Sequence, residues 1–421
     1  MIGNRWIRGY YAAYAAYAAA IAAYLWWTRG NTVPAELLGS PADPSTFMTA
    51  EQLKDSVEYG YWRSLLFFVA PPWEWGVYVT VLFSGAAVRY ERWLSGWIKR
   101  SWLRIGAYLV TLTLVVFAAV LPLRLAAYGL SRSYGITTQP LGGWLRDKLV
   151  AYGVGTLTTA IALGTILWLI RRGGRWWLKL WLLSVPFILF MMVIQPVLID
   201  PLYETFSRLS DPVLERDILR LAAEAGIPAD RVYEVAMSAK TNAMNAYVNG
   251  IGPTLRIVLW DTTLQRLDHA EIMHIMAHEI GHYAMHHLEW SALGAVGSSL
   301  VMIWLGSKLL RYVLTRFGPV WGAGRPDRPH AGLVITLLLL FSSLFSFLTL
   351  PLSNAISRQA EHAADLYALQ LVGSGTGAVT MNQKLAAGTI DIVNPPLLVY
   401  WFRSTHPTDM ERIRDASAYR P

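Results

Sequence analysis

The chain has 421 residues, of which 54% are hydrophobic and 15% are charged, and its formal net charge is +8. So apolar a composition excludes an ordinary water-soluble enzyme of this length and indicates a membrane protein. The sequence contains no cysteine, which excludes disulfides, thiolate metal ligands and a thiolate nucleophile. We assign the excess positive charge to residues beside membrane segments, and we expect no nucleic-acid partner.

Seven apolar stretches are each long enough to cross a bilayer as a helix. They lie at residues 9–28, 76–95, 105–128, 149–170, 177–199, 291–313 and 332–352. The first stretch has the length of an uncleaved anchor, with a cleaved signal peptide as the alternative. Residues 29–75 are polar at first and contain prolines, which favours a loop. The sequence therefore predicts a mainly α-helical membrane protein with about seven transmembrane helices.

Basic side chains predict how these helices are oriented. The loops after the second, fourth and sixth stretches are rich in arginine and lysine, and the positive-inside rule makes their side cytoplasmic. These residues are Arg89, Arg92, Lys99, Arg100, Arg104, Arg171, Arg172, Arg175, Lys179, Lys308, Arg311, Arg316, Arg325 and Arg328. A smaller basic group on the other side opposes this orientation: Arg124, Arg132, Arg146 and Lys148. On balance, residues 200–290 are predicted to face outward.

Residues 200–290 form a polar block between membrane segments. Apolar residues at helical spacing predict a helix over 212–225, which a Gly-Ile-Pro sequence ends. Short β-branched and aromatic runs at 232–235, 247–248 and 256–260 predict strands. A small sheet is therefore expected before the next helix.

That next helix carries the motif His278-Glu279-Ile280-Gly281-His282. Asp268 followed by Glu271 has the form of a capping box, which predicts a helix from residue 269. Residues four apart share a helix face, so His278 and His282 can bind one metal ion. Glu279 can then reach a water molecule on that metal, as in zinc peptidases.

Two other interpretations of this helix stay open. His274, His278, His282 and His286 form a stripe along one face, so other pairs could also bind a metal. A five-residue motif can also arise by chance on a structural helix. Only the pair His278 and His282 has a glutamate in the required place between its members.

A catalytic zinc ion needs a third protein ligand. Glu361 and Asp365 lie four residues apart on a predicted helix after the last apolar stretch. We expect Glu361 to be the ligand and Asp365 to accept a hydrogen bond from a ligand histidine. His362 is a rival ligand, and a solvated charged helix is the alternative. The separation from His282 along the chain does not decide between them.

Four sequence motifs between residues 200 and 415 carry a family resemblance. They are Asn245-Ala246-Tyr247, His278-Glu279-x-x-His282, Asn354-x-x-Ser357-Arg358-x-x-Glu361-x-x-Ala364-Asp365, and Ser404-Thr405-His406-Pro407 followed by Arg412-Ile413. In this order they resemble the motifs of the type I CAAX prenyl proteases, which are integral-membrane zinc metallopeptidases. The seven apolar stretches extend the resemblance over most of the chain.

The resemblance implies a fold and an assignment of site residues. The fold would be seven helices around a water-filled chamber, with a gluzincin-like zinc peptidase domain that contains the small sheet. Residues 1–199 would hold five membrane helices, 200–290 the peptidase segment, 291–352 a membrane hairpin, and 353–421 the third ligand and C-terminal site residues. The implied roles are one Zn²⁺ on His278, His282 and Glu361, Glu279 as general base, His406 at the oxyanion, Asp365, Arg358 and Arg412 around the ligands, and Asn245, Ala246 and Tyr247 on the substrate backbone.

These inferences predict a multi-pass zinc metalloendopeptidase, in the cell membrane, that acts on lipidated or membrane-associated peptides and contacts membrane lipids. The eukaryotic members of the family have their catalytic side in the cytosol, opposite to the orientation that the charges predict. An HtpX-type quality-control protease is the nearest alternative. A non-catalytic zinc-containing scaffold and a metal transporter are more distant ones. The sequence does not predict the physiological substrate or the oligomeric state.

Overall fold

The computed structural model describes residues 2–194, 205–250, 255–322 and 330–421. The end of the predicted span 177–199, the boundary predicted between residues 199 and 200, and two basic residues used for the orientation, Arg325 and Arg328, lie outside these residues.

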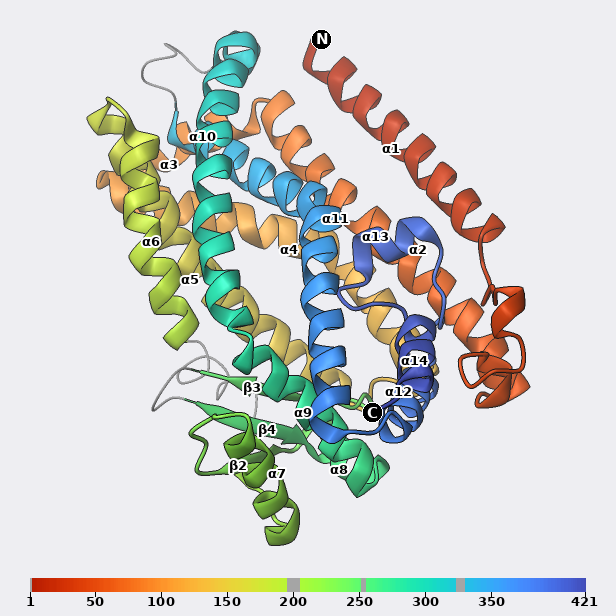
Figure 1. The fold of residues 1–421 in the computed structure, drawn as a ribbon. Coiled ribbons are helices and arrows are strands. Elements are labelled where there is room, and N and C mark those ends of the chain that lie inside the picture. The colour runs from red at the N-terminus through yellow and green to blue at the C-terminus, as the bar shows by residue number, and fades with distance from the viewer. Residues whose placement is uncertain (1, 195–204, 251–254, 323–329) are drawn as a thin grey trace.

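The described chain is mainly helical, which confirms the predicted fold class (Figure 1). Its longer helices are α1 Ile2–Trp27, α2 Ala50–Phe83, α3 Ala86–Trp97, α4 Ser101–Ser133, α5 Leu141–Arg172, α6 Trp176–Ile194, α7 Pro212–Glu224, α9 His269–Ala284, α10 His287–Trp321, α11 Ala331–Val372 and α12 Thr376–Thr389. Shorter ones are α8 Asp261–Arg266, α13 Leu397–Arg403 and α14 Asp409–Ala418. By length and composition α2, α4, α5, α10 and α11 can cross a membrane, and α6 has a shorter apolar stretch.

The second predicted span was misplaced. Helix α2 occupies much of the predicted loop, and the chain turns at Gly85, whose φ of 74° suits glycine, inside the predicted span 76–95. Pro71 and Pro72 lie inside α2, although proline removes a helix hydrogen bond to the carbonyl four residues earlier. For Pro72 that carbonyl belongs to Phe68, and it accepts a hydrogen bond from the Tyr17 hydroxyl of α1 at 3.2 Å. A neighbouring helix therefore compensates for the proline.

Two more tyrosine hydroxyls of α1 donate hydrogen bonds to backbone carbonyls of α2. The hydroxyls of Tyr10 and Tyr14 donate to the carbonyls of Pro72 and Val69 at 2.5 and 3.3 Å. The alanine and tyrosine repeat of α1 is thus the face that packs on the proline-containing turn of α2.

A four-stranded sheet lies below the membrane helices in Figure 1, in the order β1-β2-β4-β3. The strands are β1 Phe206–Arg208, β2 Val232–Val235, β3 Ala246–Asn249 and β4 Arg256–Trp260. The last three match the predicted strands, whereas β1, only three residues long, was not predicted. Strand β2 pairs in parallel with β4, and the other pairs are antiparallel. Within the described residues β3 is an edge strand.

Helix α9 packs between this sheet and α11, and its inner face is buried among side chains of the sheet and of α7. Gly281 of α9 faces Tyr367 of α11, and a Cβ atom there would lie 3.0 Å from the tyrosine ring. The glycine therefore lets the two helices meet closely beside the motif. Helix α11 continues without a break through the boundary predicted between residues 352 and 353, so one helix joins the membrane region to the site.

Two cavities adjoin each other beside α9 and the segment from α13 to α14. One, of about 590 Å³, lies between the membrane helices α2, α4 and α11. The other, of about 380 Å³, lies between α9, α12 and the segment from α13 to α14. Two arginines, Arg63 and Arg403, line both of them.

Candidate metal centre

Three side chains from two helices converge beside the smaller cavity. Nε2 of His278 lies 3.1 Å from Oε2 of Glu361 and 3.2 Å from Nε2 of His282. Nε2 of His282 lies 3.5 Å from the same Glu361 oxygen. One ligand atom from each residue falls within 4.8 Å of the other two. Two imidazoles and one carboxylate at this spacing fit a divalent metal ion.

Local structure explains how these atoms come together. The capping box of Asp268 and Glu271 starts α9 at the predicted place, with both reciprocal hydrogen bonds formed. His278 and His282 then share one face of α9, and close packing of α9 on α11 brings Glu361 opposite to them.

His278 is held by a buried chain of charges. Its Nδ1 lies 2.8 Å from Oδ1 of Asp365, and Arg412 donates two hydrogen bonds to Asp365 at 2.6 and 2.9 Å. Burial alone would lower the pKa of His278, but Asp365 and Glu361 outweigh it and raise that pKa to about 9. The same two acids therefore favour a metal cation on the other ring nitrogen.

His282 is held by His287, a residue for which the sequence analysis predicts no role. Nδ1 of His287 lies 2.9 Å from Nδ1 of His282, and the two rings meet edge to face at 4.9 Å. His286 makes the turn between α9 and α10 with φ of 57°, a conformation that few non-glycine residues adopt. That turn brings His287 back towards α9. A histidine directly after a metal-binding helix is the sequence signal that could have identified it.

Glu279 lines the smaller cavity together with His278 and His406. Burial raises the pKa of the Glu279 carboxyl, although the neighbouring histidines act in the opposite direction. A carboxyl whose pKa lies closer to neutrality is better suited to exchange protons during a reaction.

His406 lies at the mouth of the site, with 51% of its side chain exposed. Its Nε2 is 3.1 Å from Oε2 of Glu361, and its Nδ1 is 2.9 Å from the Thr405 hydroxyl. The structure thus places His406 beside the predicted ligands, with one ring nitrogen on Glu361.

Arg358 contacts the backbone of the segment that precedes His406. It donates hydrogen bonds to the carbonyls of Ser404 at 2.8 Å and Tyr400 at 3.2 Å, and its guanidinium stacks over the Tyr400 ring. Among the described residues its hydrogen bonds therefore hold the segment that carries His406, and not the three candidate ligands.

The residues predicted to bind a substrate backbone begin the edge strand β3. The backbone N–H and C=O of Asn245 are turned inward, since they bond to Thr263 and Trp260. Backbone groups alternate in direction along a strand, so those of Ala246 point to the open edge. There the Asn245 side chain accepts a hydrogen bond from the Ala246 N–H at 2.9 Å. Of the predicted residues, Ala246 has the outward-facing backbone.

Three other histidines of α9 and of the turn after it, and the rival ligand His362, lie outside the cluster. His274 is buried, and burial lowers its pKa to about 4. His269 contacts Asp217, and His286 contacts Glu289. His362 faces Asp415 at 3.8 Å with half of its side chain exposed.

Comparison with known proteins gives two family matches. The model of peptidase family M48 matches residues 208–420. The model of the CAAX prenyl protease N-terminal region, described as five membrane helices, matches residues 33–205.

Individual proteins are similar over much of the chain. An uncharacterized metalloprotease of Bacillus subtilis, YhfN, is 39% identical over 98% of this chain and 96% of its own length. A CAAX prenyl protease 1 homolog of Dictyostelium discoideum is 30% identical over 67% of this chain and 66% of its own length. The crystal structure of S. mikatae Ste24p aligns with a TM-score of 0.77 at 22% identity, covering 97% of this chain and 98% of that one, and so shows the same fold.

Proposed function

The chain belongs to peptidase family M48 and is an integral-membrane metalloprotease, and on that premise we propose that it is a zinc endopeptidase with one Zn²⁺ on His278, His282 and Glu361. The observation that carries the proposal is the convergence of these three donors within 4.8 Å. Two histidines and a glutamate are a donor set typical of catalytic zinc, which keeps a further position open for water or substrate. One chain supplies one such cluster among its described residues.

The proposed mechanism assigns each proton to a residue. Bound to these three residues, a zinc ion would supply Lewis acidity to the attacking water and to the scissile carbonyl. Glu279 takes a proton from the attacking water and later gives it to the leaving amine. His406, whose Nε2 lies 3.1 Å from Oε2 of Glu361, would turn this N–H from the carboxylate to the oxyanion that develops on the carbonyl. Asp365, with Arg412 behind it, keeps Nε2 of His278 directed at the metal.

Replacing Glu279 tests this function. Glu279→Gln keeps the shape of the side chain but removes the base, so peptide cleavage should fall about 10²- to 10⁴-fold while zinc stays bound. Cleavage of a fluorogenic peptide and metal content by mass spectrometry measure the two. Glu289→Gln, at an exposed carboxylate after α9, is the matched control. Retained cleavage in Glu279→Gln would remove Glu279 from the mechanism.

The substrates are peptides or proteins, and we propose that they are lipidated or otherwise membrane-associated. Support comes from the 590 Å³ cavity between membrane helices, which adjoins the candidate site, and from the relatives named CAAX prenyl protease 1. The family match over the five N-terminal helices favours this function over the HtpX-type alternative. Mass spectrometry of membrane peptides cleaved by the native protein but not by Glu279→Gln identifies the substrates, and only soluble, unmodified ones would contradict the proposal.

We further propose that the protein lies in the cell membrane with its catalytic side outside the cytoplasm, on the evidence of the basic loops. Because the sequence has no cysteine, single cysteines can report the orientation. Ser210→Cys lies near the sheet and Ser95→Cys near the end of α3, both at exposed positions. A membrane-impermeant maleimide on intact cells should label only the first, and labelling of only the second would reverse the orientation.

A further inference from the structure

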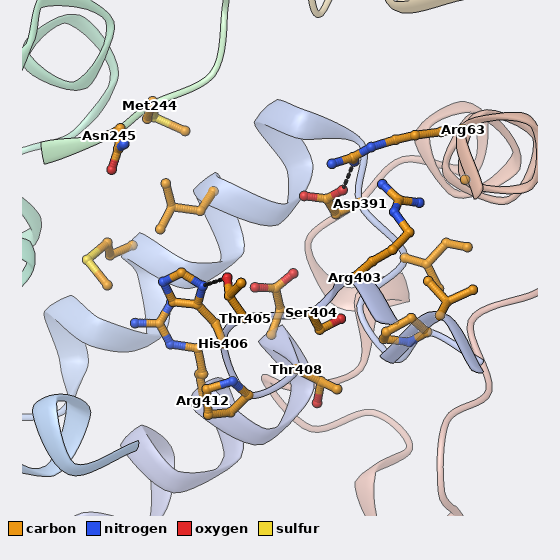
Figure 2. A pocket seen from close by; sticks show the side chains of 18 of the residues that line it. Arg63, Met244, Asn245, Asp391, Arg403, Ser404, Thr405, His406, Thr408 and Arg412 are labelled. Atoms are coloured by element: carbon orange, nitrogen blue, oxygen red, sulfur yellow. Dashed lines mark hydrogen bonds and ion pairs between the residues drawn. The ribbon is translucent and has the colours of Figure 1, made fainter. Parts of the chain in front are cut away.

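A large apolar cavity lies between helices at the end of the molecule opposite the candidate metal centre. Its volume is about 1210 Å³, and its walls come from α1, α2, α10 and α11. In Figure 1 this end carries the N-terminus and the last turns of α10, whereas α9 and the sheet lie at the other end. The cavity shares no lining residue with the pocket beside the candidate ligands, which Figure 2 shows, or with the cavity between α2, α4 and α11. The proposed proteolytic mechanism therefore does not use it.

Part of the cavity wall is a cluster of aromatic rings from three helices. Trp6 of α1 stacks on Phe83 of α2 at 5.6 Å and meets Phe317 of α10 edge to face at 5.8 Å. The Trp321 ring contacts the rings of Phe83 and Phe317 at 5.3 and 5.7 Å. Such ring pairs stabilise a packed cluster beyond the burial of their surface. This part of the wall is therefore formed without a ligand, which reduces the ordering cost of binding one.

A glycine of α1 leaves room in the same cavity. A Cβ atom on Gly9 would meet no other atom within 4 Å, in contrast to Gly281, which lies against Tyr367. Glycine destabilises a helix interior relative to alanine, and at Gly9 no close helix contact requires it. The missing side chain instead leaves space in the cavity that Gly9 lines.

Two hydrogen-bond donors at this cavity have no partner among the described residues. Trp321 is 3% exposed, and its indole Nε1 is buried without an acceptor. Arg5 lines the cavity at an exposed position and forms no ion pair with a described residue. No acidic side chain occurs among the described residues that line the cavity. A ligand with negatively charged or carbonyl oxygens would therefore supply what both donors lack.

The position of the cavity narrows the class of ligand. Three of the four helices around it, α2, α10 and α11, are long and apolar enough to cross a membrane, so lipid acyl chains are the solvent at this depth. Basic pockets between membrane helices are suited to anionic lipid headgroups. A membrane helix of another protein fits less well, because helix contacts in membranes favour small residues. Gly9 is the only small residue among the described ones that line the cavity.

We propose that this cavity binds an anionic phospholipid of the membrane. An acyl chain lies along the aromatic wall, and headgroup oxygens accept hydrogen bonds from Arg5 and from Nε1 of Trp321. The lipid thereby fills the space between α1 and α10 and stabilises the folded protein, as any ligand does that binds only the folded state. This inference does not depend on the proposed peptidase function.

Native mass spectrometry of the full chain in detergent, titrated with phosphatidylglycerol or with phosphatidylcholine of the same acyl chains, tests the proposal. The native protein should bind phosphatidylglycerol about 5- to 50-fold more tightly, because the choline group cancels the negative charge that Arg5 attracts. In Arg5→Gln this preference should disappear. Trp321→Phe keeps an aromatic ring but lacks the N–H, and should weaken phosphatidylglycerol binding about 2- to 10-fold. Gly9→Leu fills the cavity and should weaken the binding of both lipids.

Two matched controls distinguish the cavity from the rest of the surface. Arg8→Gln removes an exposed arginine of α1 that does not line the cavity. Gly294→Leu adds the same side chain to α10 at a glycine whose Cβ atom would also meet nothing within 4 Å. Both variants should bind phosphatidylglycerol as the native protein does. Phosphatidylglycerol should also raise the unfolding temperature of both controls, but less that of Arg5→Gln and Gly9→Leu.

Several outcomes would overturn the lipid site. Equal binding of the two lipids by the native protein would do so. A loss in Arg8→Gln as large as that in Arg5→Gln would mean that surface charge in general explains the preference. Unchanged phosphatidylglycerol binding in Gly9→Leu would place the lipid outside the cavity. Native dimers that Gly9→Leu dissociates would mean that a second copy of the chain occupies the cavity instead of a lipid.

Discussion

The two sides of the active-site pocket differ in how their charges are partnered. On the metal side, His278, Asp365 and Arg412 form one continuous chain with contacts of 2.6 to 2.9 Å. On the substrate side, Arg403 has no carboxylate of its own in the described contacts, and Asp409 is half-buried with a raised pKa. Buried polar groups that satisfy one another fix a geometry. Groups left without a charge partner are instead available to a ligand.

The largest effect on metal affinity and stability is expected from a substitution at Asp365, on the metal side of the pocket. Asp365→Asn removes the charge between His278 and Arg412, so metal affinity should fall about 10- to 100-fold. The free energy of unfolding should also fall, by about 3 to 5 kcal/mol, because the Arg412 side chain, only 10% exposed, loses its carboxylate. Titration against a zinc chelator and thermal unfolding measure the two effects.

Asp415→Asn provides the matched control for Asp365→Asn. Asp415 also contacts an arginine and a histidine, but its side chain is 28% exposed and Arg414 lies at the surface. Its removal should change stability by less than about 0.5 kcal/mol and leave metal affinity unchanged. If Asp365→Asn behaved like Asp415→Asn, the charge chain would not be what holds His278.

A smaller effect is expected on the substrate side, at Asp409. The folded protein holds the Asp409 proton with a pKa of about 7, compared with the ordinary value of 3.8 for an aspartate, so folding is favoured while the group is protonated. That stability is fully present below about pH 4 and is lost as the pH rises through 7, by up to about 4 kcal/mol.

Asp409→Asn removes the titrating group and should therefore flatten this dependence. Between pH 4 and pH 8, the unfolding temperature of the variant should rise relative to that of the native protein as the pH rises. At pH 4 the two proteins should unfold at the same temperature. Asp211→Asn, at the exposed start of α7, controls for the loss of one acid at a helix N-terminus. A variant less stable than the native protein at pH 8 would mean that Asp409 is ionised and paired with Arg412.

The two sides of the pocket also differ in how far the sequence could predict them. The ligand cluster depends on helix spacing and on a capping box, and both are local patterns that survive in a single sequence. Arg63 and Arg403 are 340 residues apart, and only the folding of α2 against α13 places both beside Asp391. No periodicity connects them. The misplaced second span has a similar cause, since the effect of Pro72 depends on Tyr17 of another helix.

The smallest effect on metal affinity is expected from a substitution at His287, which orients the candidate ligand His282. His278 is oriented by a carboxylate, whereas His282 is oriented by the imidazole of His287, so His287→Ala removes one uncharged hydrogen bond. Such a bond contributes about 0.5 to 1.5 kcal/mol, which corresponds to a roughly 2- to 10-fold loss of metal affinity. His269→Ala, at an exposed histidine of the same helix α9, should cause no loss. A loss as large as that of Asp365→Asn would mean that both ligand histidines depend equally on their partners, and no loss would mean that packing alone orients His282.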